Sequence, residues 1–135
     1  MALLIDSSVF ITLERRGLPL GALAAVAPDE PVALAAITAS ELLIGVWRAD
    51  TAGRRLRRQT FVEAVLSAVP VHPFDLRVAR VHAQVCAPLM ASGQAIGTHD
   101  LIIAATALAH GDTVLTDNLP DFRRVPGLSL LQPHW

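Results

Sequence analysis

Short apolar runs alternate along the chain with longer segments whose apolar residues recur at helical spacing. Strands that alternate with helices in this way are typical of a parallel sheet covered by helices. Five strands are predicted, at residues 2–5, 32–36, 71–74, 113–116 and 128–131. We therefore predict an α/β fold with three layers, in which helices flank a central parallel sheet of four or five strands.

The segments between these strands are predicted to be helical from the three- and four-residue spacing of their apolar positions. The helices are expected near residues 7–16, 20–27, 38–47, 53–69, 75–88 and 101–109. Leu42, Leu43, Val46 and Trp47 form the apolar face of the third helix. Pro88 lies inside the pattern of the fifth helix and is expected to kink or end it. The length of 135 residues suits one domain, and residues 1–135 are expected to form it.

Three carboxylates each lie where an apolar strand gives way to a helix. Asp6 follows the first strand, Glu41 comes soon after the second, and Asp100 precedes the long apolar segment 101–109. The carboxyl ends of parallel strands share one edge of the sheet, where ligands bind. Acids that meet there repel one another unless a cation lies between them, and oxygen ligands suit Mg²⁺ or Mn²⁺.

Each acid also has a purely structural interpretation. Asp6 is placed to cap a helix, and Thr38 with Glu41 has the spacing of a capping box. Asp100 is placed to interact favourably with a helix dipole. A purely structural role explains three acids in equivalent places less well than it explains one. Small residues beside them leave room for a metal and a phosphate: Ser7, Ser8, Gly97 and Thr98.

A fourth candidate region follows the strand at 113–116 and contains Asp117, Asn118 and Asp121. Asp117 and Asn118 could simply turn the chain, and Asp121 could cap a short helix. Hard cations favour carboxylate oxygen, which selects Asp117 as the fourth member of the acidic cluster.

Composition excludes several classes of protein. A net charge of -1 argues against a general duplex-binding surface, and 4% aromatic residues argue against a stacking platform for single strands. The run of arginines at 54–58 is a local basic patch, which is either a solvated helix face or a contact for phosphate or an acidic partner.

Cysteine usage and apolar run lengths bear on location. Cys86 is the only cysteine, which suits a reducing cytosol, and no disulfide can form within the chain. The apolar runs are too short to cross a bilayer, and the N-terminus does not have the basic start of a signal peptide. We therefore expect a cytoplasmic protein without membrane segments. Hydrophobic residues make up 53% of the chain, more than one small core needs, which favours a homodimer.

Segments 3–9, 38–42, 96–105 and 116–128 together resemble the PIN domain and, more narrowly, the VapC toxins of bacterial VapBC toxin–antitoxin pairs. The resemblance implies an endoribonuclease that uses Mg²⁺ or Mn²⁺, is commonly dimeric and is inhibited by an antitoxin. Asp6, Glu41 and Asp100 match the acidic positions of the family. Asp6 and Asp100 are expected to hold the metal, and Glu41 to bind it or to orient a water. The family pattern selects Asn118 at the fourth position, where charge favours Asp117. Further hydrogen bonds to the acids or to phosphate are expected from four hydroxyl residues: Ser7, Ser8, Thr98 and Thr116.

Other families that gather acids at a sheet edge fit less well. A phosphoacceptor receiver domain needs a Lys, and this chain has none. A haloacid-dehalogenase-type phosphatase needs a second carboxylate two residues after the first, where Ser8 stands here. A P-loop needs Gly-Lys followed by Ser or Thr. The remaining alternative is a catalytically silent PIN domain that binds RNA or protein, which the intact set of acids argues against.

Overall fold

A computed structural model describes residues 2–26, 28–94 and 96–135 and contains one parallel sheet in the strand order β3-β2-β1-β4-β5. β1 (Leu3–Ile5) lies at the centre, between β2 (Val32–Ala35) and β4 (Thr113–Leu115). β3 (Val71–His72) and β5 (Ser129–Leu131) form the two edges. The predicted α/β class and the parallel sheet are confirmed.

The central strand is buried on both faces because its three residues alternate between two apolar clusters. Leu3 and Ile5 belong to one cluster, and Leu4 belongs to the other. Leu4 is paired in register with Ala33 on one side and Val114 on the other, and both of those residues share its cluster. The two clusters are the cores on either side of the sheet.

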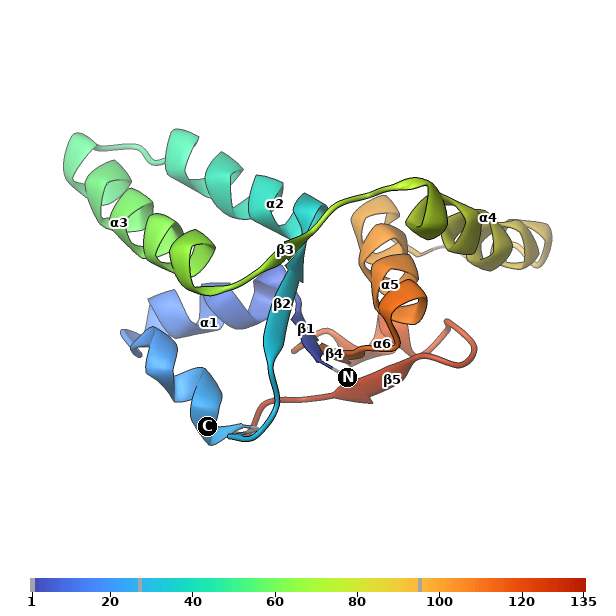
Figure 1. Cartoon of the computed structure of the whole chain (residues 1–135). Helices are drawn as coiled ribbons and strands as arrows, with labels where there is room; N and C mark the ends of the chain where they lie inside the picture. Colours follow the sequence, from blue (N-terminus) through green and yellow to red (C-terminus); the bar gives the residue numbers. More distant parts are fainter. Residues whose placement is uncertain (1, 27, 95) are drawn as a thin grey trace.

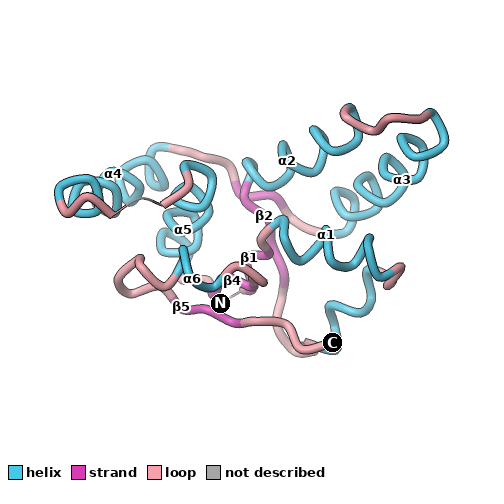
Figure 2. Tube along the Cα trace, turned by 180° about the vertical axis from the view of Figure 1, so that it is seen from behind, coloured by secondary structure: helices cyan, strands magenta, loops and turns pink. Residues whose placement is uncertain are grey.

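Helices form the two outer layers (Figures 1 and 2). The first cluster is covered by α1 (Ser7–Arg16), the short 3-10 helix η1 (Leu20–Ala25), α2 (Ala36–Trp47) and α3 (Ala52–Ala68). The opposite cluster is covered by α5 (Thr98–His110) and the short α6 (Leu119–Phe122), and α4 (Leu76–Ala91) packs on the outside of α5. The chain end returns to lie near α1 and η1 (Figures 1 and 2).

The start of α2 differs from the sequence prediction. The helix begins at Ala36 rather than Thr38, so Thr38 and Glu41 both lie inside it and cannot form a capping box. On its apolar face Leu42 and Val46 are buried, but Trp47 is 73% exposed. The expectation that Trp47 shares this apolar face is therefore wrong, because its side chain lies on the exposed side of the last turn of α2, while the adjacent Val46 is buried.

Two further differences from the predicted elements involve prolines. β3 ends at His72, one residue before Pro73, whose missing N–H cannot extend the ladder. The expectation that Pro88 ends its helix is wrong, because α4 continues to Ala91. Pro88 lies in the last turns, and its carbonyl still accepts a hydrogen bond from the Ser92 N–H at 3.0 Å. Whether the helix is kinked there stays a prediction.

Two smaller points complete the fold. The short helix expected at 20–27 is described as far as Ala25, and Ala27 lies outside the described residues. No helix in the described ranges is both long and apolar enough to cross a membrane.

Candidate active site

Asp6 is fixed at the centre of the carboxyl edge by two hydroxyl groups. It directly follows β1 and is only 4% exposed. The hydroxyls of Ser8 and Thr116 both donate to its Oδ2, each at 2.8 Å. Asp6 occupies the N-cap position of α1, but its side chain makes no capping hydrogen bond. The simple capping interpretation is therefore wrong, because the carboxylate binds two side-chain hydroxyls and no N–H group of the helix start.

The same two hydroxyls anchor the turn that follows β4. The Ser8 hydroxyl accepts the backbone N–H of Asp117 at 3.1 Å, and the Thr116 hydroxyl accepts that of Asn118 at 2.8 Å. Within the described ranges no hydrogen bond reaches the other oxygen of Asp6, Oδ1. One oxygen of Asp6 is thus occupied in orienting the carboxylate, and the second keeps its lone pairs for a ligand.

Glu41 points at the same edge from the second turn of α2. Burial raises the pKa of its carboxyl above the ordinary value, and the charge of Asp6 adds to this. His99 acts in the opposite direction and lowers the pKa, since its Nδ1 lies 3.5 Å from Glu41 Oε2. The other oxygen, Oε1, is buried without a hydrogen-bond partner among the described residues. An unsatisfied buried oxygen of this kind is costly unless a ligand completes it.

Asp100 lies in the first turn of α5. The sequence placed it directly after a strand, but α5 follows α4 through a loop. Asp100 still reaches the carboxyl edge because a helix that leads into a parallel strand begins at that edge. Burial first, and then the charges of Asp6, Asp121 and Glu41, raise its pKa to about 6. The side-chain amide of Asn118 lies 3.4 Å from its Oδ2.

The fourth candidate region places its two acids in different directions. Asp121, in the first turn of α6, both repels Asp100 and shares a hydrogen bond with it, and both effects raise the pKa of Asp100. Asp117 instead accepts a hydrogen bond from the Thr12 hydroxyl of α1 at 2.9 Å. The geometry thus favours Asp121, which sequence reasoning had ranked last, as the acid beside Asp100. The turn after Thr116, which the hydroxyls of Ser8 and Thr116 hold, brings Asp121 beside Asp100. No local sequence pattern predicts this position of Asp121.

The remaining residues predicted to assist the acids differ in their contacts. The Ser7 hydroxyl lowers the pKa of Glu41 slightly, as the weakest of the contributing effects. Thr98 is exposed at the first position of α5. His99, which the sequence did not select as a site residue, lies beside Glu41. Its position next to Asp100 did not mark His99 as a site residue in the sequence, because adjacent residues on a helix face different ways.

The donor set can be tested against a divalent cation. Asp6 Oδ1 and Glu41 Oε1 have no hydrogen-bond partner among the described residues, and the charge of Asp6 raises the pKa of both Glu41 and Asp100. Both features suit a bound cation, which would occupy free oxygens and remove the repulsion. Within residues 2–26, 28–94 and 96–135, no group of three or more His, Cys, Asp or Glu side chains already stands in positions that could hold an ion. Carboxylate oxygens are suitable ligands for Mg²⁺ or Mn²⁺, but these side chains do not converge on one point.

Crowding at this edge predicts a pH-dependent gain in stability for Asp100→Asn in metal-free buffer. A folded-state pKa of about 6, against an ordinary 3.8, means that the folded chain binds the proton more tightly than the unfolded chain. This stabilisation is complete below the unfolded pKa and is lost as pH rises through about 6. Asn carries no such charge. At neutral pH the free energy of unfolding of the variant should therefore exceed that of the wild type by about 1–2 kcal/mol, a value reduced because Asp100 is partly exposed.

Urea denaturation with chelator at about pH 4.5 and about pH 7.5 measures this difference. The free energy of unfolding of the variant should exceed that of the wild type only at the higher pH. Asp29→Asn, in the exposed loop before β2, is the matched control and should show no such change. An Asp100→Asn variant that is less stable at both pH values would contradict the expected repulsion.

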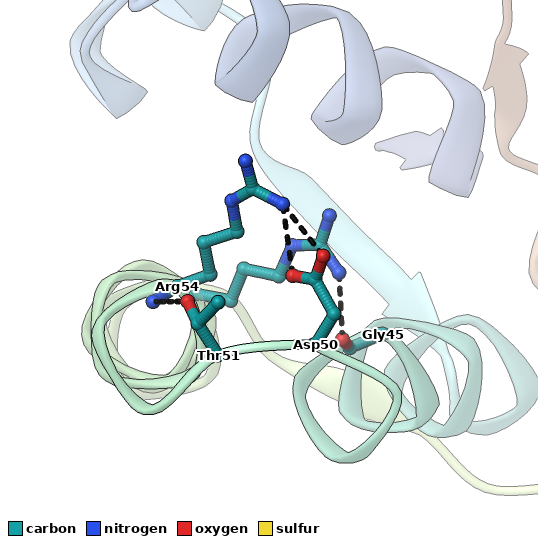
Figure 3. Close-up of polar contacts among 5 residues, drawn as sticks. Gly45, Asp50, Thr51 and Arg54 are labelled. Atoms are coloured by element: carbon teal, nitrogen blue, oxygen red, sulfur yellow. Dashed lines mark hydrogen bonds and ion pairs between the residues drawn. The ribbon is translucent and has the colours of Figure 1, made fainter.

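The Arg-rich run at 54–58 lies at the start of α3, and hydrogen bonds within the chain hold two of its four arginines (Figure 3). Arg54 Nη1 donates to both carboxylate oxygens of Asp50, at 2.9 and 2.7 Å. Arg58 donates to the Gly45 carbonyl at 3.0 Å and to Glu14 at 3.2 Å. These bonds join α3 to α2 and α1. The run therefore has a packing role, and phosphate or partner binding stays a prediction for its other two arginines.

Comparison with known proteins gives consistent results. The family model of the PIN domain matches residues 3–128. "Ribonuclease VapC1" of Rickettsia felis is 37% identical over 133 residues, which cover 97% of this chain and 96% of that protein. The crystal structure of VapBC-5, a toxin–antitoxin system member from Mycobacterium tuberculosis, matches with 31% identity and a TM-score of 0.75, over 99% of this chain and 98% of that one. VapBC2 from Rickettsia felis, solved with a promoter DNA fragment, shares the fold with a TM-score of 0.87 at 23% identity, over 99% of this chain and 100% of that one.

Proposed function

We propose that this chain, which belongs to the PIN domain family and within it to the VapC ribonucleases, is the toxin of a type II toxin–antitoxin pair and cleaves RNA with the help of Mg²⁺ or Mn²⁺. The relatives named ribonuclease support the nuclease activity. The observation that carries the mechanism is that Asp6, Asp121 and Glu41 lie close enough to Asp100 to act on its pKa. The burial of Asp100 and then the charges of these three acids raise that pKa to about 6.

In this proposal Asp6 and Asp100 hold the cation, and Glu41 holds it or orients the attacking water through its partnerless Oε1. A bound divalent ion supplies an activated water and offsets the negative charge that builds up on the scissile phosphate. Ser8 and Thr116 keep the Asp6 carboxylate in one orientation, so that Oδ1 faces the ligand. In-line attack by water needs no Ser, Cys or His nucleophile from the chain.

The two neighbours of Glu41 and Asp100 have positioning roles. His99 Nδ1, at 3.5 Å from Glu41 Oε2, restrains one oxygen of that carboxylate and leaves Oε1 free. Asn118 donates to Asp100 Oδ2 at 3.4 Å and restrains it in the same way. Partners of this kind around metal ligands typically contribute tenfold to hundredfold in affinity or activity.

The fourth acidic position can be assigned by comparing Asp121→Asn with Asp117→Asn, which remove the same charge from two places on one turn. Asp121→Asn should raise the Mg²⁺ concentration needed for half-maximal cleavage by about tenfold, because it removes a carboxylate beside Asp100. Asp117→Asn should leave the titration unchanged, since that carboxylate binds Thr12. Asn118→Ala should have a smaller effect than Asp121→Asn. If Asp117→Asn alone shifts the titration, the charge argument from sequence is right and the geometric one is wrong.

A partner antitoxin is supported by the VapBC toxin–antitoxin neighbours and by exposed apolar side chains on the α2–α3 hairpin. Ile44, Trp47 and Leu56 are 47%, 73% and 65% exposed there. The Arg55 guanidinium lies 5.8 Å from the centre of the Trp47 ring. A surface that combines exposed apolar groups with cations suits a partner segment that carries apolar and acidic residues.

A homodimer is also part of the proposal. Apolar side chains are exposed away from the hairpin as well, at Phe74, Leu76 and Met90, which are 47%, 66% and 78% exposed around α4. A second copy of the chain would cover such a surface. Light scattering at tens of micromolar distinguishes a dimer from a monomer. The cytosolic location stays a prediction.

Expression in a bacterial host tests the toxin assignment. The wild-type chain should arrest growth, because RNA cleavage depletes the host of functional transcripts, and co-expression of the neighbouring small gene should relieve the arrest. Asp6→Asn, expressed to the same level, should be harmless. A harmless wild-type chain with intact acids would favour the silent RNA- or protein-binding module instead.

A further inference from the structure

We propose that the cavity between α1 and the C-terminal segment binds the RNA strand next to the scissile phosphate, with Arg15 and Arg16 contacting its phosphates. The cavity has a volume of about 720 Å³ and is lined by α1 from Ser8 to Arg16, the turn after β4 and residues 132–135. The assignment rests on the proposed nuclease function and adds to it the place where the substrate is held.

Two residues make the cavity continuous with the acidic site. Ser8 lines the cavity and donates to Asp6 Oδ2 at 2.8 Å. Asn118 also lines it, and its side-chain amide lies 3.4 Å from Asp100 Oδ2. A chain of nucleotides whose phosphate lies at the acids therefore continues into this cavity.

The charge of the cavity complements the charge of the site. Four acids at the carboxyl edge repel an RNA backbone, so the affinity for RNA must come from cations nearby. Arg15 and Arg16 line the cavity, are exposed, and make no hydrogen bond or ion pair within the described ranges. Arg54 and Arg58 on α3, in contrast, are bound to acids of the chain. Asp117 also lines the cavity and keeps its negative charge, although its carboxylate is held by the Thr12 hydroxyl. The two arginines still leave the charged side chains of the lining with a net positive charge.

The position of the two arginines at the end of α1 also suits the helix dipole. That effect explains why basic residues are tolerated there, but a dipole alone would be served equally well by arginines facing away from the cavity. A guanidinium group offers two parallel donors to a phosphate, which makes free arginines beside a nuclease site suitable for the backbone.

An aromatic wall completes the cavity. Trp135 lines it and is half-buried against the core cluster of α1 and α3, and His134 lies next to it. An indole in this position provides a face on which a base can stack, an interaction that tolerates every base. The chain contains only two Trp residues, and the second, Trp47, lies on α2 and does not line this cavity. The fluorescence of Trp135 can therefore report the binding of RNA in the cavity.

The test measures binding separately from cleavage. A labelled single-stranded RNA of about 12 nucleotides is titrated with the chain in chelator, and fluorescence anisotropy gives the dissociation constant. Arg15→Gln combined with Arg16→Gln should weaken binding at least about fivefold and reduce the salt slope by about 1.4, for two lost phosphate contacts on a single strand. The matched control, Arg48→Gln combined with Arg80→Gln, removes two exposed arginines that do not line the cavity, and its dissociation constant should stay within about twofold of the wild-type value. Equal losses in both double variants, or none in the first, would overturn the assignment.

A second readout locates the RNA. In Trp47→Phe the emission comes from Trp135 alone, and it should change on addition of the RNA. Emission that stays constant while anisotropy reports saturation would place the RNA elsewhere and overturn the assignment.

Cleavage assays then separate this inference from the proposed function. In steady-state cleavage with Mg²⁺, the Arg15 and Arg16 double variant should raise KM at least about fivefold with kcat within about threefold, because the arginines bind the strand and do not touch the reacting atoms. A wild-type chain that binds RNA through these arginines without cutting it would refute the nuclease and support the cavity. A chain that cuts RNA equally well with and without them would refute the cavity and support the nuclease.

Discussion

Asp6→Asn and Asp100→Asn are each expected to lower the rate of RNA cleavage by at least about a hundredfold, the scale seen when an electrostatic contact to the transition state is lost. The structure gives Asp6→Asn a specific reason. The amide oxygen of Asn can take the place of Oδ2 and keep both hydrogen bonds, from Ser8 and Thr116. The amide NH₂ then stands where Oδ1 was, and it presents protons to the ligand position. The fold is conserved while cation binding is lost.

Folding and activity therefore have to be measured together. Circular dichroism and the urea midpoint should match the wild type or exceed it, since each substitution removes one like charge from a crowded edge. Asp29→Asn, on the exposed loop before β2, serves as the matched control and should cleave at the wild-type rate. Wild-type cleavage by well-folded Asp6→Asn would rule out the acids as the catalytic site.

Removal of divalent ions is expected to stop cleavage altogether. The acids at this edge include two oxygens without hydrogen-bond partners among the described residues, and repulsion from its neighbours helps to raise the pKa of Asp100 to about 6. Such a set of groups is suited to a cation, and without one it repels the phosphate backbone. Cleavage should cease after chelation and dialysis and return on addition of Mg²⁺ or Mn²⁺.

Ca²⁺ makes this prediction sharper. It binds carboxylates but takes more ligands at longer distances than Mg²⁺, so it should occupy the site without restoring the rate. RNA cleavage measured after dialysis, with each ion added back, separates these outcomes. Cleavage that persists in dialysed, chelated protein would exclude the metal-dependent mechanism, whatever the effect of the acid substitutions.

The acids at the strand–helix junctions were predictable from the sequence because local patterns determine them. Apolar runs identify β1 and β2, and parallel strands bring the residues beyond their carboxyl ends to one edge of the sheet. The sequence alone therefore places Asp6 and Glu41 at that edge. Asp100 reaches the edge by a different route, as part of the first turn of a helix leading into β4. The sequence placed that residue correctly but gave the wrong reason for it.

Asp121 could not be placed in this way, because its position depends on bonds between residues distant in sequence. The turn after β4 is held by Ser8 and Thr116, which lie 108 positions apart and both bind Asp6. No local pattern encodes such a pairing. The same limit applies to Trp47, which its helical spacing places on an apolar face but which is exposed, although the adjacent Val46 is buried.

The bond between Thr116 and Asp6 also has a consequence for the order of synthesis. The oxygen of Asp6 and the hydroxyl that orients it are separated by 110 residues, and β4 completes the sheet beside β1 only late in the chain. At typical elongation rates a ribosome needs roughly 5 to 20 s to travel that distance. A nascent or prematurely terminated chain carries Asp6 and Glu41 without the segment that orients the first and supplies the charge beside Asp100. We therefore expect that a chain becomes competent to cleave RNA only after the segment that contains Thr116 has been synthesised and has paired beside β1.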